Sequence, residues 1–164
     1  MTNLPPPDLR HLDAAKGWLE LLAFEDAARE LECVSPAHRE HPAVLEVRWG
    51  LAANAGHWNE ALAIARCIAT AVPSKPMGWL YQGSALAGLS RYAEAYSMLL
   101  MGHQRFPHDE IFAYDLSCVC CSLGREGEAL GWIRQAIAMA GFEIQERALD
   151  DPDLERIRDR LTGD

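Results

Sequence analysis

The stretch PMGWLYQGSALAGLSRYAEAYSMLLMGHQRFPHD, residues 76–109, decides the fold because its spacing recurs before and after it. It contains two apolar runs with helical spacing, residues 76–89 and 92–105, separated by a very short break. A connection this short joins two antiparallel helices that are neighbours in space. The small residues Gly83 and Ala95 predict a close approach of the two helix backbones. The stretch therefore predicts one helix pair.

The same pattern returns when the 34-residue frame is moved along the chain in either direction. Alanine occupies position 20 of every frame, and an acidic residue always precedes it. These pairs are Asp26-Ala27, Glu60-Ala61, Glu94-Ala95 and Glu128-Ala129. A register without gaps over four frames predicts an array of helix pairs rather than a chance match.

The spacing of the key residues in this frame resembles that of the tetratricopeptide repeat. Positions 4, 8, 11, 17, 20, 24 and 32 are occupied by Trp79, Gly83, Leu86, Tyr92, Ala95, Leu99 and Pro107. The resemblance implies an all-α fold, a right-handed α-α superhelix of four helix pairs followed by a capping helix. It covers residues 8–162, which we expect to form one solenoid domain.

The chain then divides into a short lead-in, four repeats and a tail. The expected boundaries are a proline-rich lead-in at 1–7, repeats at 8–41, 42–75, 76–109 and 110–143, and a linker with a capping helix at 144–164. We expect Pro5-Pro6-Pro7 to be extended and Asp8 to cap the first helix. We also expect Asp109 to begin the fourth repeat as a cap, and Gly141 to end its second helix.

Two positions of the frame vary in an informative way. Position 15, in the turn, is glycine at Gly56 and Gly124, where a positive φ is accessible, but it is Leu22 in the first repeat. Position 8, the close-contact position, is Trp49 in the second repeat. Either Gly50 takes over that role or the helix rotates.

Composition limits the classes of partner. The 164 residues are 49% hydrophobic and 24% charged, with a formal net charge of −9. An acidic chain gains no counterion release from phosphates, so we expect neither nucleic acid nor an anionic membrane as partner. The sequence has no long apolar run and no apolar signal segment near its N-terminus. We therefore expect a soluble, cytoplasmic protein.

The resemblance also implies where a partner binds. In this family the first helices of successive pairs line a concave groove, to which positions 2, 5, 9, 12 and 13 contribute, with position 6 beside them. The predicted partner-binding residues are Leu12, Lys16, Glu46, Met77, Leu80, Tyr81, Ser84, Ala87, Ile111, Tyr114, Asp115, Cys118 and Cys121. Most are apolar or small. We expect Leu80, Tyr81 and Tyr114 to be exposed there, although packing within or between helices is an open alternative for each residue.

Two functions remain open. The groove lacks the Lys, Arg and Asn clamp with which chaperone cofactors of this family hold a carboxylate, since only Lys16 and Asn54 are of that kind. An apolar groove predicts a non-enzymatic interaction module, an adaptor, scaffold or co-chaperone-like protein. Its partner would be a peptide or amphipathic helix with apolar anchors, with basic residues favoured by Glu46 and Asp115. The alternative is a self-associating structural subunit that buries the groove in a homo-oligomer.

Catalytic, metal and cofactor sites are not predicted. Cys118 and Cys121 share a helix face, but no Cys or His is spaced to complete a four-ligand zinc site with them. The five cysteines are an odd number, which favours reduced thiols over a disulfide framework. We expect the histidines, including His38 and His41, to be exposed loop residues. No nucleotide-binding or nucleophile motif occurs.

Overall fold

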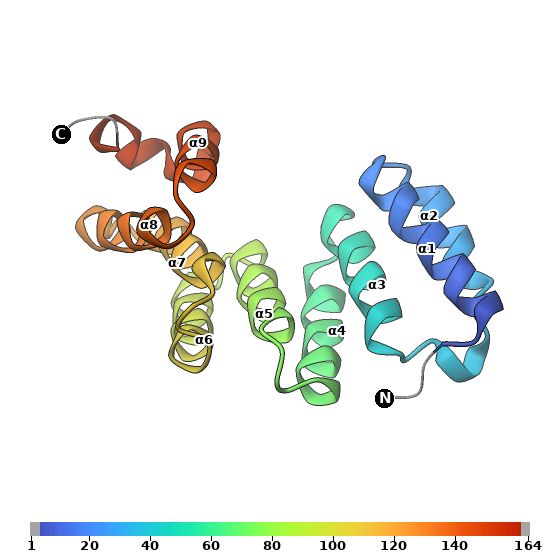
Figure 1. The fold of residues 1–164 in the computed structure, drawn as a ribbon. Coiled ribbons are helices and arrows are strands. Elements are labelled where there is room, and N and C mark those ends of the chain that lie inside the picture. Colours follow the sequence, from blue (N-terminus) through green and yellow to red (C-terminus); the bar gives the residue numbers. More distant parts are fainter. Residues whose placement is uncertain (1–3, 162–164) are drawn as a thin grey trace. The chain divides into compact units, whose positions relative to one another are not determined.

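The computed structural model describes residues 4–161, and every regular element within that range is a helix (Figure 1). The chain divides into two compact units between Tyr81 and Gln82, a boundary that falls inside one helix. The first unit contains α1 (Pro6–Glu20), α2 (Phe24–Glu32), the 3₁₀ helix η1 (Pro36–His38), α3 (Pro42–Asn54), α4 (Trp58–Ala71) and the start of α5 (Met77–Gly88). The second contains the rest of α5, α6 (Tyr92–Arg105), α7 (Glu110–Ser122), α8 (Glu126–Ala140), α9 (Phe142–Asp150) and the 3₁₀ helix η2 (Pro152–Arg160). None of the described helices combines the length and the apolar character that crossing a membrane requires.

Consecutive helices pack in pairs, as the repeat register predicts. In the first unit α1 packs against α2 and α3 against α4, and in the second α7 packs against α8. Within the described residues the fold is all-α, and no strand occurs. Pro42 lies in the first turn of α3, and the side chain of Asp109 caps α7 by accepting the Ile111 N–H at 3.1 Å. The predicted cap at Asp109 is therefore confirmed.

The N-terminal prediction is wrong in two respects. Helix α1 begins at Pro6, so the second and third residues of the Pro5-Pro6-Pro7 run are helical rather than extended. Proline fits the first turn of a helix because its fixed φ is helical and its missing N–H has no partner there in any case. Asp8 consequently lies inside the helix instead of capping it. Residues 1–3 of the expected lead-in lie outside the described residues.

The turn that closes each helix pair repeats with the 34-residue period. Leu22, Gly56, Ser90 and Gly124 all have positive φ, at 58°, 71°, 59° and 72°. In each turn the next residue donates its N–H to the carbonyl five residues before it, as Ala23 does to Trp18 at 2.9 Å and Arg125 to Cys120 at 2.8 Å. This is the Schellman arrangement, in which a left-handed residue ends the helix. Two of the four turns therefore use a residue other than glycine.

Small residues allow close helix contacts where the frame predicts them. A Cβ added to Gly83 would lie 2.4 Å from the Leu99 side chain, so α5 and α6 touch at this glycine. In the second repeat Gly50 packs against the preceding repeat, because a Cβ there would meet the Leu19 side chain of α1 at 2.8 Å. Trp49 instead stacks on Tyr81, with ring centroids 3.9 Å apart and planes inclined by 10°. The Gly50 contact is thus made between repeats and differs from the contact within a pair that Gly83 makes.

The tail is more structured than a linker followed by one helix. Gly141, with φ 77°, ends α8 as predicted, but the next residues form a further helix, α9. The final segment, η2, is a 3₁₀ helix capped by Asp151, which accepts the Asp153 N–H at 2.9 Å. Leu154 and Ile157 are fully buried in a core shared with α7 and α8. The expected capping contact is therefore present, although not as an α-helix.

Candidate binding site

The predicted groove residues are distributed over both units, and each unit is described on its own. In the first unit the structure separates them by burial. Leu12 is only 1% exposed and belongs to the core formed with Ala15, Val34 and Val44, so its assignment to an open groove is wrong. Leu80 is 7% exposed, which also contradicts its expected exposure. Lys16 is exposed, and Glu46 and Met77 are half-buried.

Tyr81 keeps part of its surface exposed through an aromatic pair. Its ring stacks on Trp49, which covers one face of the ring, and the residue as a whole is half-buried. Burial, followed by the nearby Glu46 carboxylate, raises the pKa of Tyr81 to about 12, so the hydroxyl remains a neutral hydrogen-bond group at any physiological pH. Tyr81, Trp49 and Glu46 thus form an amphipathic patch on the first unit.

In the second unit a pocket of about 160 Å³ gathers several predicted residues. Ser84, Ala87, Tyr114, Asp115 and Cys118 all line it. They come from α5 and α7, the first helices of successive repeats, as the frame predicts. The remaining lining residues are Gly83, Leu99, Val119, Arg147, Asp151 and Asp153. We call this cavity the α5–α7 pocket. Ile111 is half-buried, and neither it nor Cys121 lines the pocket.

Tyr114 is a structural residue of this pocket and not an exposed anchor. It is 1% exposed, and its hydroxyl donates a hydrogen bond to Asp151 Oδ2 at 2.6 Å. The Arg147 guanidinium lies over its ring, 4.4 Å from the centroid. Burial, and then the bond to Asp151, raise the pKa of Tyr114 well above its ordinary value. The prediction that Tyr114 is exposed is wrong because α9 and η2 fold back over α7.

Asp115 is half-buried and contributes a carboxyl group to the pocket. Burial raises its pKa to about 7, against the opposing effect of Arg147 and with smaller contributions from Asp109 and Asp151. Desolvation disfavours the charged form, so this carboxyl group ionises less readily than an exposed one.

Three lining residues of the pocket, Arg147, Asp151 and Asp153, were not predicted from the sequence because they lie in the tail. The only signal was the Asp151-Pro152 pair, which marks a helix start.

Cys118, Cys120 and Cys121 serve as packing residues of the second unit. Cys120 and Cys121 are buried in the second unit's core, which contradicts the placement of Cys121 in the groove, whereas Cys118 is half-buried at the pocket wall. Burial is the main cause that raises the pKa of all three thiols, in the case of Cys120 to about 12. A thiol that stays protonated is a poor nucleophile and metal ligand. Among the described residues no cluster of three or more His, Cys, Asp or Glu side chains has the geometry to hold a metal.

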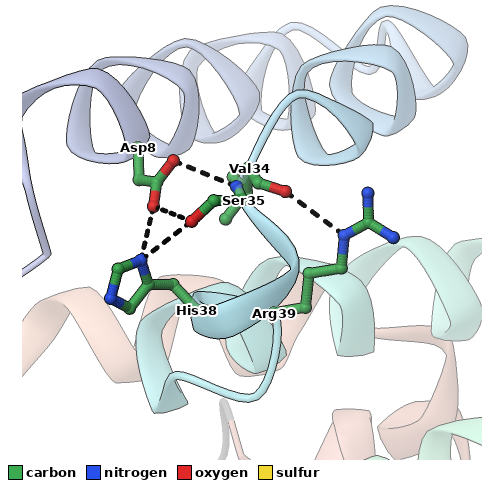
Figure 2. Close-up of polar contacts among 5 residues, drawn as sticks. All are labelled: Asp8, Val34, Ser35, His38 and Arg39. Carbon is green, nitrogen blue, oxygen red and sulfur yellow. Dashed lines mark hydrogen bonds and ion pairs between the residues drawn. The ribbon is translucent and has the colours of Figure 1, made fainter.

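Three polar side chains in the first unit meet in an arrangement that invites comparison with a catalytic triad. Figure 2 shows Asp8, Ser35 and His38 converging where the chain leaves α2. Asp8 Oδ2 lies 2.5 Å from Ser35 Oγ and 2.6 Å from His38 Nδ1, and Asp8 Oδ1 accepts the Ser35 N–H at 3.0 Å. In a triad the serine and the carboxylate bond to opposite ring nitrogens. Here both lie against Nδ1, so the cluster ties α1 to the α2–α3 connection.

Several histidines make hydrogen bonds or aromatic contacts that the sequence did not predict. His38 is half-buried in that cluster, and His11 Nδ1 lies 2.7 Å from Glu30 Oε2, which joins α1 to α2. His41 caps α3 by accepting the Ala43 N–H at 3.3 Å. His103 packs edge-on against Trp132, with ring centroids 5.3 Å apart. The expectation of exposed loop histidines is therefore wrong for these four.

A second, larger hollow lies outside the predicted groove. It has a volume of about 620 Å³ and lies on the first unit, with walls from α2, α3 and the start of α4. Its apolar residues include Phe24, Leu31 and Val44, and its rim is charged, with Arg48 and Glu40 paired at 3.5 Å. The groove positions of the frame do not include its lining, so no sequence signal pointed to it.

Comparisons with known proteins agree with the fold. No protein-family model matches the sequence, and no curated protein matches it. Among solved structures, the chain is similar to TTC0263, a thermophilic TPR protein of Thermus thermophilus, with 17% identity and a TM-score of 0.79 over 94% of this chain and 83% of that one. It is also similar to a MamA protein, with 16% identity and a TM-score of 0.66 over 94% and 86% of the two chains.

A further similarity is to the MamA MSR-1 C2 structure, with 19% identity and a TM-score of 0.62 over 84% of this chain and 76% of that one. Sequence identities this low are evidence for a shared fold alone. The helix pairs, the 34-residue turns and these structural similarities agree with one another. The chain therefore has the fold of the tetratricopeptide-repeat proteins.

Proposed function

We propose that this chain is a non-enzymatic protein-interaction module that binds a segment of another protein at the α5–α7 pocket. The observation that carries the proposal is the convergence of Ser84, Ala87, Asp115 and Cys118 on one cavity. These residues are half-buried, so each keeps surface for a ligand. Small side chains on α5 leave room for a partner, and the packed Tyr114 and Leu99 give the pocket a firm wall.

The size of the pocket limits what it can hold. About 160 Å³ accommodates one side chain and not a whole helix. We therefore expect an extended peptide or one face of an amphipathic helix to lie across the second unit and to place one residue in the pocket. Rigid, preformed pockets favour binding because little ordering is required when the ligand arrives.

Blocking the pocket tests this function. Ala87→Trp places a large ring at the pocket wall, whereas Ala138→Trp adds the same ring to an exposed position of α8. Both variants and the wild type are used as baits in the native cell, and bound proteins are quantified by mass spectrometry. We expect a set of proteins to be retained by the wild type and Ala138→Trp and depleted about tenfold or more by Ala87→Trp, the effect of losing a hot-spot contact. Equal capture by all three baits would exclude the pocket as the site.

Self-association is the second candidate, and a specific feature of the first unit favours it. Leu21 is 72% exposed and Leu22 is 69% exposed, and both lie at the α1–α2 turn near the half-exposed Trp18. Apolar groups gathered at one place on a surface mark interaction sites. Sedimentation velocity over a range of concentrations separates the candidates. A dimer abolished by Leu21→Asp would establish self-association through this turn, and a monomer at every concentration would exclude it.

A further inference from the structure

Asp115 differs from Asp151, the neighbouring carboxylate of the α5–α7 pocket, in having both oxygens available. Asp151 already uses Oδ2 to accept the Tyr114 hydroxyl and Oδ1 to accept the Asp153 N–H. No hydrogen bond or close ion pair within the described residues reaches the Asp115 carboxyl group. The carboxyl group is nevertheless largely surrounded by protein, and it lines a preformed cavity. A desolvated carboxylate of this kind lacks the cation that would compensate its charge.

The pocket's own cation does not fill that role. Arg147 is close enough to favour the ionised form of Asp115, but its guanidinium is placed over the Tyr114 ring. The lining residues carry three carboxyl groups, those of Asp115, Asp151 and Asp153, against this one guanidinium. The pocket therefore presents an excess of negative charge to anything that enters it.

We propose that the α5–α7 pocket binds the cationic head of a lysine or arginine side chain from the partner segment, with Asp115 as its counter-ion. Ala87, Leu99 and Val119 line the same cavity and offer apolar contact to the methylene stem of such a side chain. The Ser84 hydroxyl adds a neutral acceptor at the wall. The inference rests on the proposed function and adds to it the charge of the anchoring residue.

The ionisation of Asp115 supports this assignment and gives it a pH dependence. Burial raises the pKa of Asp115 to about 7, Arg147 lowers it, and Asp109 and Asp151 raise it further. Asp153, Tyr114 and Cys118 also line the pocket, and burial is the main cause that raises the pKa of each. A bound cation stabilises the charged carboxylate, so affinity must increase as pH rises through the pKa of Asp115. An alkylammonium probe stays protonated throughout, since such groups titrate near pH 10.

The test uses small cations, so that it does not depend on knowing the partner. The ¹H–¹⁵N NMR spectrum of the full chain is titrated with n-butylammonium for lysine, ethylguanidinium for arginine, and neutral n-butanol as the isosteric control. We expect saturable shifts at the amides of Ser84, Ala87 and Asp115 with at least one cation and not with n-butanol. Affinity should fall about tenfold or more between pH 8.5 and 5.5, because Asp115 becomes protonated.

Two variants that each remove one negative charge complete the test. Asp115→Asn removes the counter-ion at nearly constant shape, whereas Asp150→Asn removes an exposed carboxylate of the same unit outside the pocket. Binding of the cation should weaken about tenfold or more in the first variant and change little in the second. Circular dichroism melting confirms that Asp115→Asn is folded. Equal weakening in both variants, or shifts by n-butanol as large as those by the cations, would overturn the inference.

The outcome is separable from that of the proposed function. If Ala87→Trp depletes partners but neither cation binds at Asp115, the pocket takes an uncharged residue and only the charge assignment fails. If a cation binds but Ala87→Trp captures the same proteins as the wild type, the pocket recognises cations without serving as the partner site. Each result therefore decides one proposal.

Discussion

Leu22 shows at the scale of a single residue how the repeat period dominates local preference. Its φ of 58° matches those of Gly56 and Gly124, whose turns lie 34 and 102 residues further along the chain. A left-handed conformation costs a residue with a Cβ roughly 1–2 kcal/mol. The side chain recovers little of this cost, since it is 69% exposed. The turn keeps its shape because the helices on either side require it.

We expect Leu22→Gly to stabilise the first unit by about 0.5–1 kcal/mol, the relief of backbone strain reduced by the greater freedom of glycine in the unfolded chain. The reverse change at the equivalent turn, Gly56→Leu, should destabilise it by about 1–2 kcal/mol, although a Cβ there meets no atom within 4 Å. Urea unfolding followed by circular dichroism measures both. A loss of stability in Leu22→Gly would show that the leucine side chain matters more than its φ.

Asp8 gives the first unit a predictable response to acid. Hydrogen bonds from the Ser35 hydroxyl and then from its backbone N–H, with a smaller effect of His38, lower the pKa of Asp8 from 3.8 to about 2. A lowered pKa means that the unfolded chain binds the proton more readily than the folded one. The stability due to this group is therefore complete above about pH 4 and is lost as pH falls toward 2.

Asp8→Asn should therefore lower the thermal midpoint of the first unit at pH 6 and should make that midpoint less sensitive to pH between 4 and 2. Asp13→Asn, an exposed carboxylate of the same helix, serves as the matched control. Melting curves at several pH values within this range give the comparison. An unchanged pH dependence in Asp8→Asn would show that the Ser35 bonds do not favour the ionised form.

At the scale of the helix, the sequence predicted what depends on neighbours within one repeat. The turn glycines Gly56 and Gly124, the cap at Asp109 and the contact at Gly83 were all foreseen, because local backbone geometry favours those residue types. The start of α1 was misjudged because a proline run is compatible with both an extended segment and a first helical turn. Asp8 was assigned to a cap, but its actual partners, Ser35 and His38, lie 27 and 30 residues away in sequence.

The contact between α4 and α5 depends on Gly78. A Cβ at this position would lie 2.5 Å from the Cα and N atoms of Ala69, and backbone atoms cannot move aside as a side chain can. We expect Gly78→Ala to destabilise the first unit by about 1–3 kcal/mol, because the two helices must separate. The prediction concerns helix packing, since alanine by itself favours helix over glycine.

Gly17→Ala is the control for this packing effect. Gly17 lies within α1, and a Cβ added there meets no atom within 4 Å. The same substitution should therefore stabilise the first unit by roughly 0.5–1 kcal/mol, the difference in helix propensity. Chemical denaturation of both variants decides the matter. Similar effects of the two substitutions would contradict the close contact at Gly78.

At the scale of the whole chain, the sequence pattern brought some of the pocket's lining residues together and could not complete the pocket. Ser84, Ala87 and Cys118 were found because helical periodicity puts their positions on one face of α5 or α7. Arg147, Asp151 and Asp153 were missed because their place depends on how the tail folds back, and no periodic signal encodes that. Tyr114 was called exposed for the same reason. Its cover is Asp151 and Arg147, which are more than thirty residues away in sequence.

We therefore expect residues 151–164 of the tail both to stabilise the second unit and to form part of its pocket. Leu154 and Ile157 are completely buried against Ile133, Ala136 and their neighbours, and Asp151 holds the Tyr114 hydroxyl. Removing residues 151–164 exposes this core and leaves the Tyr114 hydroxyl without its acceptor. Exposed apolar surface at the end of a repeat array favours association. The truncated chain should melt at a lower temperature and should aggregate at concentrations where the full chain does not.

A point substitution distinguishes the effect of lost core packing from the effect of removing residues 151–164. Leu154→Ala in the full chain should cost about 2–5 kcal/mol, the usual loss for a buried leucine, because its side chain is 0% exposed. Glu155→Ala changes an exposed neighbour in the same 3₁₀ helix and should cost little. Hydrogen exchange at the α7 and α8 amides, together with light scattering, reports both effects. If Leu154→Ala exchanges no faster than Glu155→Ala, then η2 does not support the second unit, and the buried position of Tyr114 must be maintained by α9 alone.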